Sequence, residues 1–309
     1  MFLTVILCTH NPRIEVLRQT LDGLKQQSLD AAQWELLLVD NASDVAITEN
    51  LLGDYSPQIR VIREPRLGLT PARLCGIRQA EGELLVFVDD DNVLDPDYLK
   101  NALEISRNHP KLGAFGGSIK AVFEEEAPAW TQPYWYLLAV RDTPEDRISM
   151  APGNAAAEPC GAGLCVRKEV AQQYARYIEN DPIRRALDRS GSSLASSGDM
   201  DLVYTAFDLG YGIGRFRSLV LHHLIPPTRL TEAYFLRIFE AMYYSGTMLK
   251  KIRGTRDEEN QFSVIQTLRR WKHFVFGHSL DRRMMLAERR GRRRALIDWR
   301  NMHYHEDLI

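Results

Sequence analysis

The chain has 309 residues, of which 45% are hydrophobic and 26% are charged, and its formal net charge is −2. A chain of this length and composition folds around a sizeable core, and its near-neutral charge argues against a protein that coats nucleic acid. No stretch approaches the roughly 18 uncharged apolar residues that a membrane span requires. The 4 cysteines form neither a CxxC pair nor a regular framework, which indicates reduced thiols. We therefore expect a cytoplasmic protein that at most lies on the inner face of a membrane, with no nucleic-acid partner.

Apolar runs and helical patterns fill the first hundred residues. Strands are predicted at 3–7, 34–39, 59–62 and 84–88. Helices are predicted after the first and third strands, the first capped by Thr9 or Asn11 and the second by Thr70. Strands that alternate with helices indicate a parallel, doubly wound sheet.

Polar residues follow three of these strands, where the carboxyl ends of parallel strands meet. They are Thr9–Asn11, Asp40–Asn41 and Asp89–Asp91. Adjacent carboxylates repel one another, so the last group indicates a cation or a donor-rich ligand at the edge where α/β sheets bind ligands. For an Asp cluster alone, a solvated acidic turn that caps the next helix is about as common. Neither a GxGxxG motif nor a Walker loop is present, which favours metal-assisted transfer from a nucleotide.

The middle of the chain adds two features that suit a sugar ligand. Further strands are predicted at 113–123, 164–166 and 212–221, and a helix at 202–209. Trp130 and Trp135 lie in an aromatic stretch that either stacks on a sugar ring or packs a helix onto the core, and packing is the commoner role. Gly161 and Gly163 allow the backbone to come close to another group.

Carboxylates and histidines follow in the next fifty residues. Asp199 and Asp201 open the predicted helix, where acidic residues most often serve as caps. His222 and His223 come directly after the last predicted strand, and one imidazole there can complete a metal shell with one Asp. With diphosphate oxygens as the other ligands the ion is Mg²⁺ or Mn²⁺, and the imidazole favours Mn²⁺. Which histidine binds is left open by the sequence.

A basic, helical extension begins after residue 228. A helix is predicted at 230–250, and eleven Arg and Lys residues against three acids lie between 268 and 300. Apolar residues interleave with the basic ones at 268–276, which suits peripheral contact of 268–300 with an anionic membrane. A solvated helix that packs its apolar side on the rest of the protein is an equally common arrangement.

Six stretches, in this order, resemble the motifs of family 2 glycosyltransferases, which are inverting enzymes of the GT-A fold. The stretches are Thr4–Asn11, Val39–Ser43, Gly68–Ile77, Phe87–Asp91, Gly161–Lys168 and Ser197–Leu202. Two positions depart from the family, because His10 stands where Tyr or Phe is frequent and Gly198 where Glu is common. The resemblance implies an α/β fold with a mainly parallel, twisted sheet flanked by helices. It places a catalytic domain at 1–228, with a nucleotide-binding half at about 1–110 and an acceptor half at about 111–228, before a helical extension at 229–309.

The resemblance also implies an activity. A sugar is transferred with inversion from a nucleoside-diphosphate sugar, UDP being the favoured nucleotide, to a hydroxyl of a sugar, lipid-linked or other acceptor in polysaccharide or glycoconjugate synthesis. Asp199 is then the general base, and Mn²⁺ or Mg²⁺ is the cofactor. The implied nucleotide-binding residues are Thr9, Asn11, Asp40, Arg73, Asp89 and Asp90, the metal ligands are Asp91 with His222 or His223, and the sugar-contacting residues are Trp130, Trp135, Gly161, Gly163 and Asp201.

Two alternatives carry less weight. A sugar nucleotidyltransferase with a related sheet usually has a loop rich in Gly and Lys after its first strand, and this chain has none. A non-catalytic nucleotide-sugar-binding protein of the same fold would not need the intact acids at Asp89–Asp91 and Asp199.

Overall fold

The computed structural model describes residues 2–48, 59–255 and 279–303, and the chain divides into two compact units. The first unit comprises Met1–Asn180 and Asp199–Pro227, and the second comprises Asp181–Gly198 and Thr228–Ile309. The domain boundary expected at residue 228 stays a prediction, because this division follows contacts and not independent folding.

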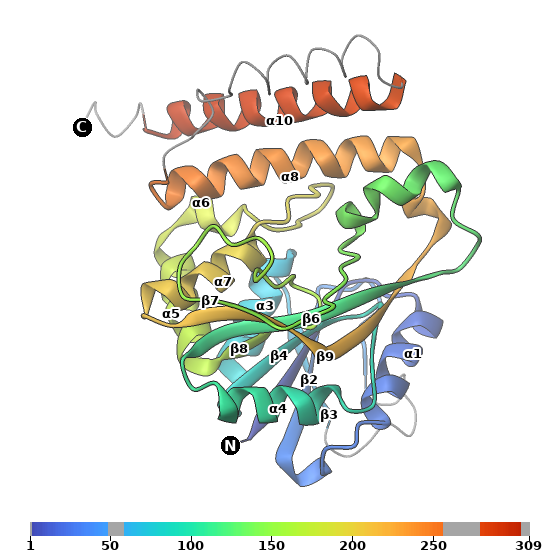
Figure 1. The fold of residues 1–309 in the computed structure, drawn as a ribbon, viewed down its shortest axis with the longest axis vertical. Helices are drawn as coiled ribbons and strands as arrows, with labels where there is room; N and C mark the ends of the chain where they lie inside the picture. The colour runs from blue at the N-terminus through green and yellow to red at the C-terminus, as the bar shows by residue number, and fades with distance from the viewer. Residues whose placement is uncertain (1, 49–58, 256–278, 304–309) are drawn as a thin grey trace. The chain divides into compact units, whose positions relative to one another are not determined.

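In the described part of the first unit, a mixed sheet of nine strands forms the centre, in the order β3-β2-β1-β4-β8-β6-β9-β5, with β7 paired to β9 (Figure 1). The strands are β1 (Leu3–Thr9), β2 (Trp34–Asn41), β3 (Ile59–Glu64), β4 (Leu84–Asp89), β5 (Asn92–Leu94), β6 (Leu112–Phe123), β7 (Arg147–Ser149), β8 (Cys165–Arg167) and β9 (Gly212–Ile225). Neighbours among β1–β4 are parallel, as are β6 and β9, whereas the three-residue strands β5, β7 and β8 run antiparallel to their partners. The predicted, mainly parallel sheet is confirmed.

Helices cover both faces of this sheet, because the strands are apolar on both sides. Leu3, Val5 and Leu7 of β1 belong to one hydrophobic cluster with α1 (Ile14–Lys25) and α4 (Tyr98–Asn108). Ile6 belongs to a second cluster. That cluster contains side chains of α3 (Leu69–Gln79), α5 (Lys168–Asn180) and α7 (Gly198–Asp208). Alternating side chains of a strand point to opposite faces, so the unit has three layers, helix, sheet and helix.

Two predicted helix caps are wrong. The N-cap of α1 is Arg13, whose side chain makes no capping hydrogen bond. The N-cap of α3 is Gly68, which has a φ of 134°, a value that residues with a side chain rarely adopt. Thr70 lies inside α3 and is buried. In both cases long-range contacts of the flanking loop, described below, decide where the helix begins.

The expected strand end before the two histidines is also wrong. β9 continues through Ile225, because it stays paired with β6 as far as Phe123 and with β5 at Asn92. His222 and His223 therefore lie within a strand, and their side chains point to opposite faces of the sheet.

The second unit is helical, as expected for the extension. Its described residues form the α-helices α6 (Pro182–Arg185), α8 (Glu232–Ile252) and α10 (Ser279–His303). The Thr231 hydroxyl caps α8 by accepting a hydrogen bond from the amide of Tyr234. Among the described helices, none is both long enough and apolar enough to cross a membrane. The segment 268–276, predicted to contact a membrane, lies outside the described residues.

Candidate active site

The carboxyl ends of β1, β2 and β4 form one edge of the first unit, because these strands are adjacent and parallel (Figure 1). The register places Thr9 beside Asp40 and Cys8 beside Asp89. The three polar groups that the sequence singled out therefore meet at this edge.

Asn11 joins the loop after β1 to the loop after β2. Its amide N donates to Oγ of Ser43 (2.9 Å), and its side chain both donates to Oδ2 of Asp44 (2.9 Å) and accepts from the Asp44 amide (2.8 Å). The φ of Asn11 is 47°, a left-handed conformation that Asn tolerates better than most residues. Asn11 thus fixes the two loops relative to each other, at the edge where a ligand would bind.

Asp40 is 1% exposed, and its carboxylate is already well supplied with donors. It accepts hydrogen bonds from the amides of Ser43 (3.1 Å) and Ile47 (3.3 Å) and pairs with Nη1 of Arg63 (2.7 Å). Sequence reasoning missed Arg63, although it lies directly opposite Asp40 in the register of β2 and β3. Apolar runs predict that two strands pair, but they do not set which residues face each other.

Asn41, next along β2, holds the loop that leads into α3. Its Oδ1 accepts from the amide of Gly68 (2.8 Å), and its Nδ2 donates to the carbonyl of Arg66 (2.7 Å). With a 4% exposed side chain, Asn41 sets the start of α3 and hence the position of Arg73 within it.

The acidic triplet lies at this edge, where Asp89 ends β4 and Asp90 and Asp91 form the turn that leads to β5. Thr9 donates its hydroxyl proton to the carboxylate of Asp90, and Asn92 donates to Oδ1 of Asp91 (2.9 Å). Asp91 is 8% exposed. The next helix, α4, begins only at Tyr98, after Asp97, so the triplet does not cap it.

Asp91 faces His223, whose other ring nitrogen is fixed. His223 Nε2 lies 3.4 Å from Oδ2 of Asp91, and His223 Nδ1 lies 2.9 Å from the carbonyl O of Leu138. A carbonyl only accepts, so Nδ1 donates to it, and Nε2 is the ring nitrogen that faces the carboxylate. This arrangement, in which the outer nitrogen of an imidazole donates to a carbonyl, is common for metal-ligating histidines.

His222 is placed differently, since its Nε2 lies 3.0 Å from Oδ1 of Asp95. Within the described ranges, no group of three or more His, Cys, Asp or Glu side chains could hold a metal ion. Asp91 and His223 offer two ligands that fit Mn²⁺ or Mg²⁺, which leaves the remaining ligand positions to a substrate or water.

Asp199 lies at the start of α7, and two backbone amides fix its carboxylate. Oδ2 accepts from the amide of Gly161 (2.9 Å), and Oδ1 accepts from the amide of Met200 (2.8 Å). Each carboxylate oxygen has a second lone pair, and the side chain is half-buried. The two amides therefore fix the orientation of the Asp199 carboxylate.

Gly161 is the point at which Arg73 and Asp199 converge. A Cβ at this position would lie 2.8 Å from Oδ2 of Asp199 and 3.0 Å from Nη2 of Arg73. Arg73 is buried, and its guanidinium carbon lies 5.9 Å from the ring centroid of Phe87 in β4. The expectation of a close backbone approach at Gly161 is met by these two side chains.

The predicted sugar-contacting residues differ in accessibility. Trp130 is 38% exposed, whereas Trp135 donates from Nε1 to Oγ1 of Thr131 (3.0 Å) and packs against the ring of Phe123. Asp201 is 0% exposed and is the least accessible of the set. Gly163 has a φ of 71°, and its carbonyl accepts a hydrogen bond from the hydroxyl of Tyr98 (2.6 Å). This bond holds the loop in place from its buried side.

Two thiols lie beside these groups and stay protonated. Burial raises the pKa of Cys8 to about 12, although the positive charge of Arg73 opposes the shift. Burial also raises the pKa of Cys160, and the carboxylate of Asp199 adds to that rise. Neither cysteine is a thiolate near neutral pH, so neither provides a nucleophile.

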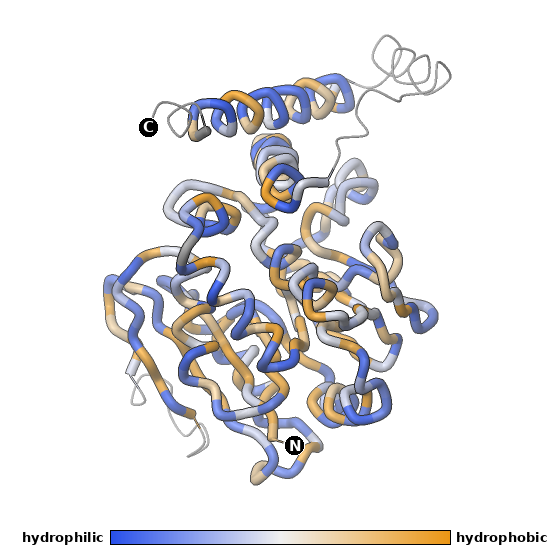
Figure 2. The backbone as a smooth tube through the Cα atoms, turned by 90° about the vertical axis from the view of Figure 1, so that its left-hand side faces the viewer, coloured by the Kyte–Doolittle hydropathy of each residue, from blue (hydrophilic) through white to orange (hydrophobic). Residues whose placement is uncertain are grey.

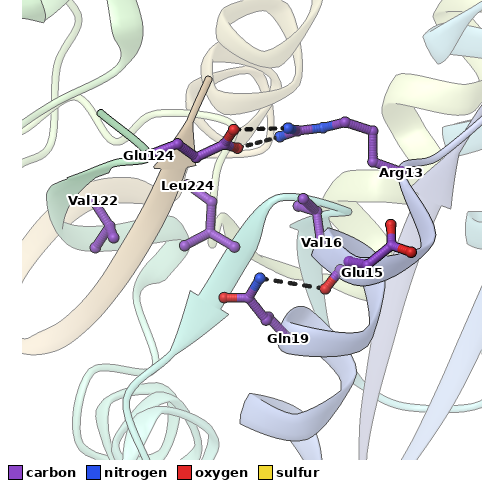
Figure 3. A pocket seen from close by; sticks show the side chains of 7 residues that line it. All are labelled: Arg13, Glu15, Val16, Gln19, Val122, Glu124 and Leu224. Atoms are coloured by element: carbon purple, nitrogen blue, oxygen red, sulfur yellow. Dashed lines mark hydrogen bonds and ion pairs between the residues drawn. The ribbon is translucent and has the colours of Figure 1, made fainter. Parts of the chain in front are cut away.

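A cavity of about 400 Å³ opens at the carboxyl-terminal ends of β6 and β9 (Figure 3). It is lined by Arg13, Glu15, Val16, Gln19, Val122, Glu124 and Leu224. Arg13 and Glu124 close one side through an ion pair of 2.6 Å. Leu224 follows His223 in β9, so the cavity lies on the opposite face of that strand, and none of the predicted site residues lines it.

Known proteins resemble both the sequence and the fold. Residues 4–174 match the family described as Glycosyl transferase family 2. A glucosyl-dolichyl phosphate glucuronosyltransferase of Haloferax volcanii is 20% identical over 139 residues, which are 45% of this chain and 44% of that protein. The succinoglycan biosynthesis protein ExoW of Rhizobium meliloti is 31% identical over 107 residues, 33% of each protein. The chain thus matches less than half the length of these relatives.

Among solved structures, TarS of S. aureus in complex with UDP-GlcNAc aligns with 89% of this chain and 73% of its own, at a TM-score of 0.56 and 16% identity. That similarity shows a shared fold, which confirms the GT-A architecture. The family match spans more than half of the chain and includes the edge formed by β1, β2 and β4. The chain belongs to glycosyl transferase family 2.

Proposed function

We propose that the protein transfers a sugar, with inversion, from a nucleoside-diphosphate sugar to an acceptor hydroxyl in polysaccharide or glycoconjugate synthesis. The observation that carries this proposal is the carboxylate of Asp199, held by the amide of Gly161 beside Arg73. UDP is the favoured donor nucleotide, which the UDP-GlcNAc complex of a protein with the same fold supports.

Asp199 acts as the general base. As the acceptor oxygen attacks C1 of the donor sugar, its proton passes to a carboxylate oxygen of Asp199. The bond from C1 to the acceptor oxygen forms while the bond from C1 to the diphosphate oxygen breaks. One displacement inverts the anomeric carbon, so the mechanism needs no nucleophilic side chain, in keeping with the protonated states of Cys8 and Cys160.

Asp91 and His223 would hold Mn²⁺ or Mg²⁺. When bound, such an ion offsets the charge that develops on the departing diphosphate. His223 contributes through Nε2, since its Nδ1 proton is engaged by Leu138. Because His222 faces Asp95 instead, we assign it no metal-binding role.

The remaining edge residues would bind the nucleotide. Thr9 and Asp40 recognise the base, Asp89 the ribose, and Arg73 lies nearby. Asp40 already pairs with Arg63, the more exposed partner of the two. An N–H group of the nucleotide base would therefore have to share the Asp40 carboxylate with Arg63. On the acceptor side, the exposure of Trp130 makes it a better sugar platform than Trp135.

Incubation with UDP-sugars, Mn²⁺ and water tests this function. We expect slow release of UDP, which requires the metal and stops when EDTA is added. Release of pyrophosphate from a nucleoside triphosphate and a sugar phosphate would instead indicate a nucleotidyltransferase. Binding of UDP-sugars without any turnover would indicate a non-catalytic binding protein.

A further inference from the structure

The orientation of α10 about its own axis is fixed by its packing on α8. Leu280, Met284, Ala287 and Ala295 are buried, at the spacing of one helical face. On the same face, Gly291 lies so close to the backbone carbonyl of Glu240 that a Cβ would not fit. The opposite face of α10 therefore points away from α8.

This opposite face carries a regular row of side chains, here named the outer stripe. Its members recur at steps of three and four residues, and all are exposed: Arg282, Leu286, Arg289, Arg293, Ile297 and Arg300. The row is about 27 Å long at the rise of an α-helix. Figure 2 shows that α10 is mostly hydrophilic, with hydrophobic positions in between.

The arginines of α10 fall into a paired and an unpaired set. Four of them form ion pairs with carboxylates of α8 or of α10 itself: Arg283 with Glu232, Arg290 with Glu240, Arg292 with Glu288 and Arg294 with Asp298. The four arginines of the outer stripe form no ion pair within the described chain. No acidic residue of α10 is in the exposed class, since Asp281 and Asp298 are half-buried and Glu288 is buried.

Such a surface is unlike an ordinary solvated helix face. Solvated faces mix both signs of charge and gain from pairs one turn apart, whereas the outer stripe places four like charges in a row. Its cations are all arginine, whose planar guanidinium binds phosphate oxygens in a fork and is more weakly hydrated than an ammonium group. The stripe also exposes Leu286 (42%) and Ile297 (46%) between the charges.

We propose that the outer stripe docks flat on a membrane surface rich in anionic phospholipid. The guanidinium groups would bind lipid phosphates while Leu286 and Ile297 enter the boundary between headgroups and acyl chains. Nucleic acid also offers phosphates, but it gives the two interleaved aliphatic side chains no apolar region to enter. The inference is independent of the proposed reaction, because it rests only on α8 and α10.

Vesicle sedimentation of the full-length protein tests the proposal with matched variants. R282Q/R289Q/R293Q/R300Q removes the four unpaired charges, and R283Q/R290Q/R292Q/R294Q removes the same number of paired ones. Wild type is expected to bind vesicles containing phosphatidylglycerol at low salt and to bind pure phosphatidylcholine weakly. A basic residue near an anionic surface contributes roughly a fivefold factor, so the first variant should bind several hundredfold more weakly, while the second stays near wild type.

A third variant, L286S/I297S, keeps every charge and changes only exposed side chains, so it should fold as wild type does. It is expected to bind the anionic vesicles severalfold more weakly and duplex DNA unchanged. Equal losses for the two arginine variants in proteins of unchanged circular dichroism would overturn the proposal, as would tighter binding to duplex DNA than to the vesicles. UDP release measured without vesicles reports separately on the proposed reaction.

Discussion

His223 and His222 are neighbours in sequence, yet they offer different chemistry. His223 directs Nε2 at Asp91, because the carbonyl of Leu138 holds its Nδ1, whereas His222 faces Asp95. We predict that His223→Ala weakens Mn²⁺-dependent binding of UDP by about 10- to 100-fold, the usual range for losses around a metal ligand.

His222→Ala is the matched control, and it should leave this binding near the wild-type value. Isothermal titration of UDP with and without Mn²⁺ measures both variants. Equal effects of the two substitutions, or a loss confined to His222→Ala, would contradict the assignment.

Gly161 has no side chain where Arg73 and Asp199 meet, and this absence has a functional consequence. In Gly161→Ala the new Cβ would lie 2.8 Å from Oδ2 of Asp199, so the carboxylate has to move. Because a displacement near 1 Å can cost about 100-fold in rate, we expect turnover to fall by at least about tenfold with little change in the affinity for UDP.

Gly246→Ala provides the comparison, since a Cβ at Gly246 in α8 meets nothing within 4 Å. Steady-state kinetics should show wild-type turnover for this variant. Unchanged turnover in Gly161→Ala would mean that the position of the Asp199 carboxylate does not limit the reaction.

At the scale of elements, the end of β3 contributes a pH-dependent part of stability. Glu64 is 6% exposed, and the hydrogen bonds from the Arg66 side chain, aided by its backbone amide, lower the pKa of Glu64. A folded-state pKa below the unfolded value stabilises the protein above the unfolded pKa, and this stabilisation is lost as pH falls through the folded-state pKa.

We therefore predict that wild type loses more free energy of unfolding than Glu64→Gln when pH is lowered from about 5 to about 3. Urea unfolding at a series of pH values measures the two slopes. Parallel curves for the two proteins would show that the Glu64–Arg66 contact does not contribute to acid sensitivity.

The predicted strands and helices show which information a single sequence carries. Long apolar runs such as 84–88 identified strands correctly, because burial on both faces demands them. The predicted caps were wrong, because the helices begin after Arg13 and Gly68 instead. Asn11 and Asn41 form contacts with residues more than twenty positions away, which local capping rules do not include. Three-residue strands such as β5 depend on a partner strand for their existence, so no local pattern predicts them.

Across the whole molecule, the second unit joins two stretches that are far apart in sequence. The Ser245 hydroxyl in α8 accepts hydrogen bonds from the amide of Ser196 (3.3 Å) and the hydroxyl of Ser197 (2.9 Å). Both serines belong to the stretch 181–198, so α8 restrains the end of this stretch within the second unit.

We predict that Ser245→Ala speeds hydrogen exchange at the Ser196 amide severalfold, because removal of one hydrogen bond costs about 1 kcal/mol. Thr247→Ala is the control, since the buried Thr247 hydroxyl donates to the carbonyl of Tyr243, within the same helix. Equal exchange rates at Ser196 in the two variants would show that the Ser245 contact does not restrain this segment.

The family and the GT-A fold could be predicted from the sequence, because strand-end motifs recur in a fixed order. The choice between His222 and His223 could not be predicted. It depends on the register of β9 against β5 and on the carbonyl of Leu138, which lies 85 residues away from His223. The division of the arginines in α10 was hidden for a similar reason. Their charge is plain in the sequence, but two of the four ion-pair partners lie on α8, a separate helix.

The central claim is that Asp199 accepts the proton of the attacking hydroxyl. Asp199→Asn keeps an oxygen for the amide of Gly161 but removes the basic charge. Turnover of the UDP-sugar by this variant, measured alongside UDP affinity, tests the claim most directly. We predict a loss of turnover of at least about 100-fold with UDP affinity unchanged. Turnover within about twofold of wild type would contradict the role of Asp199 as the general base.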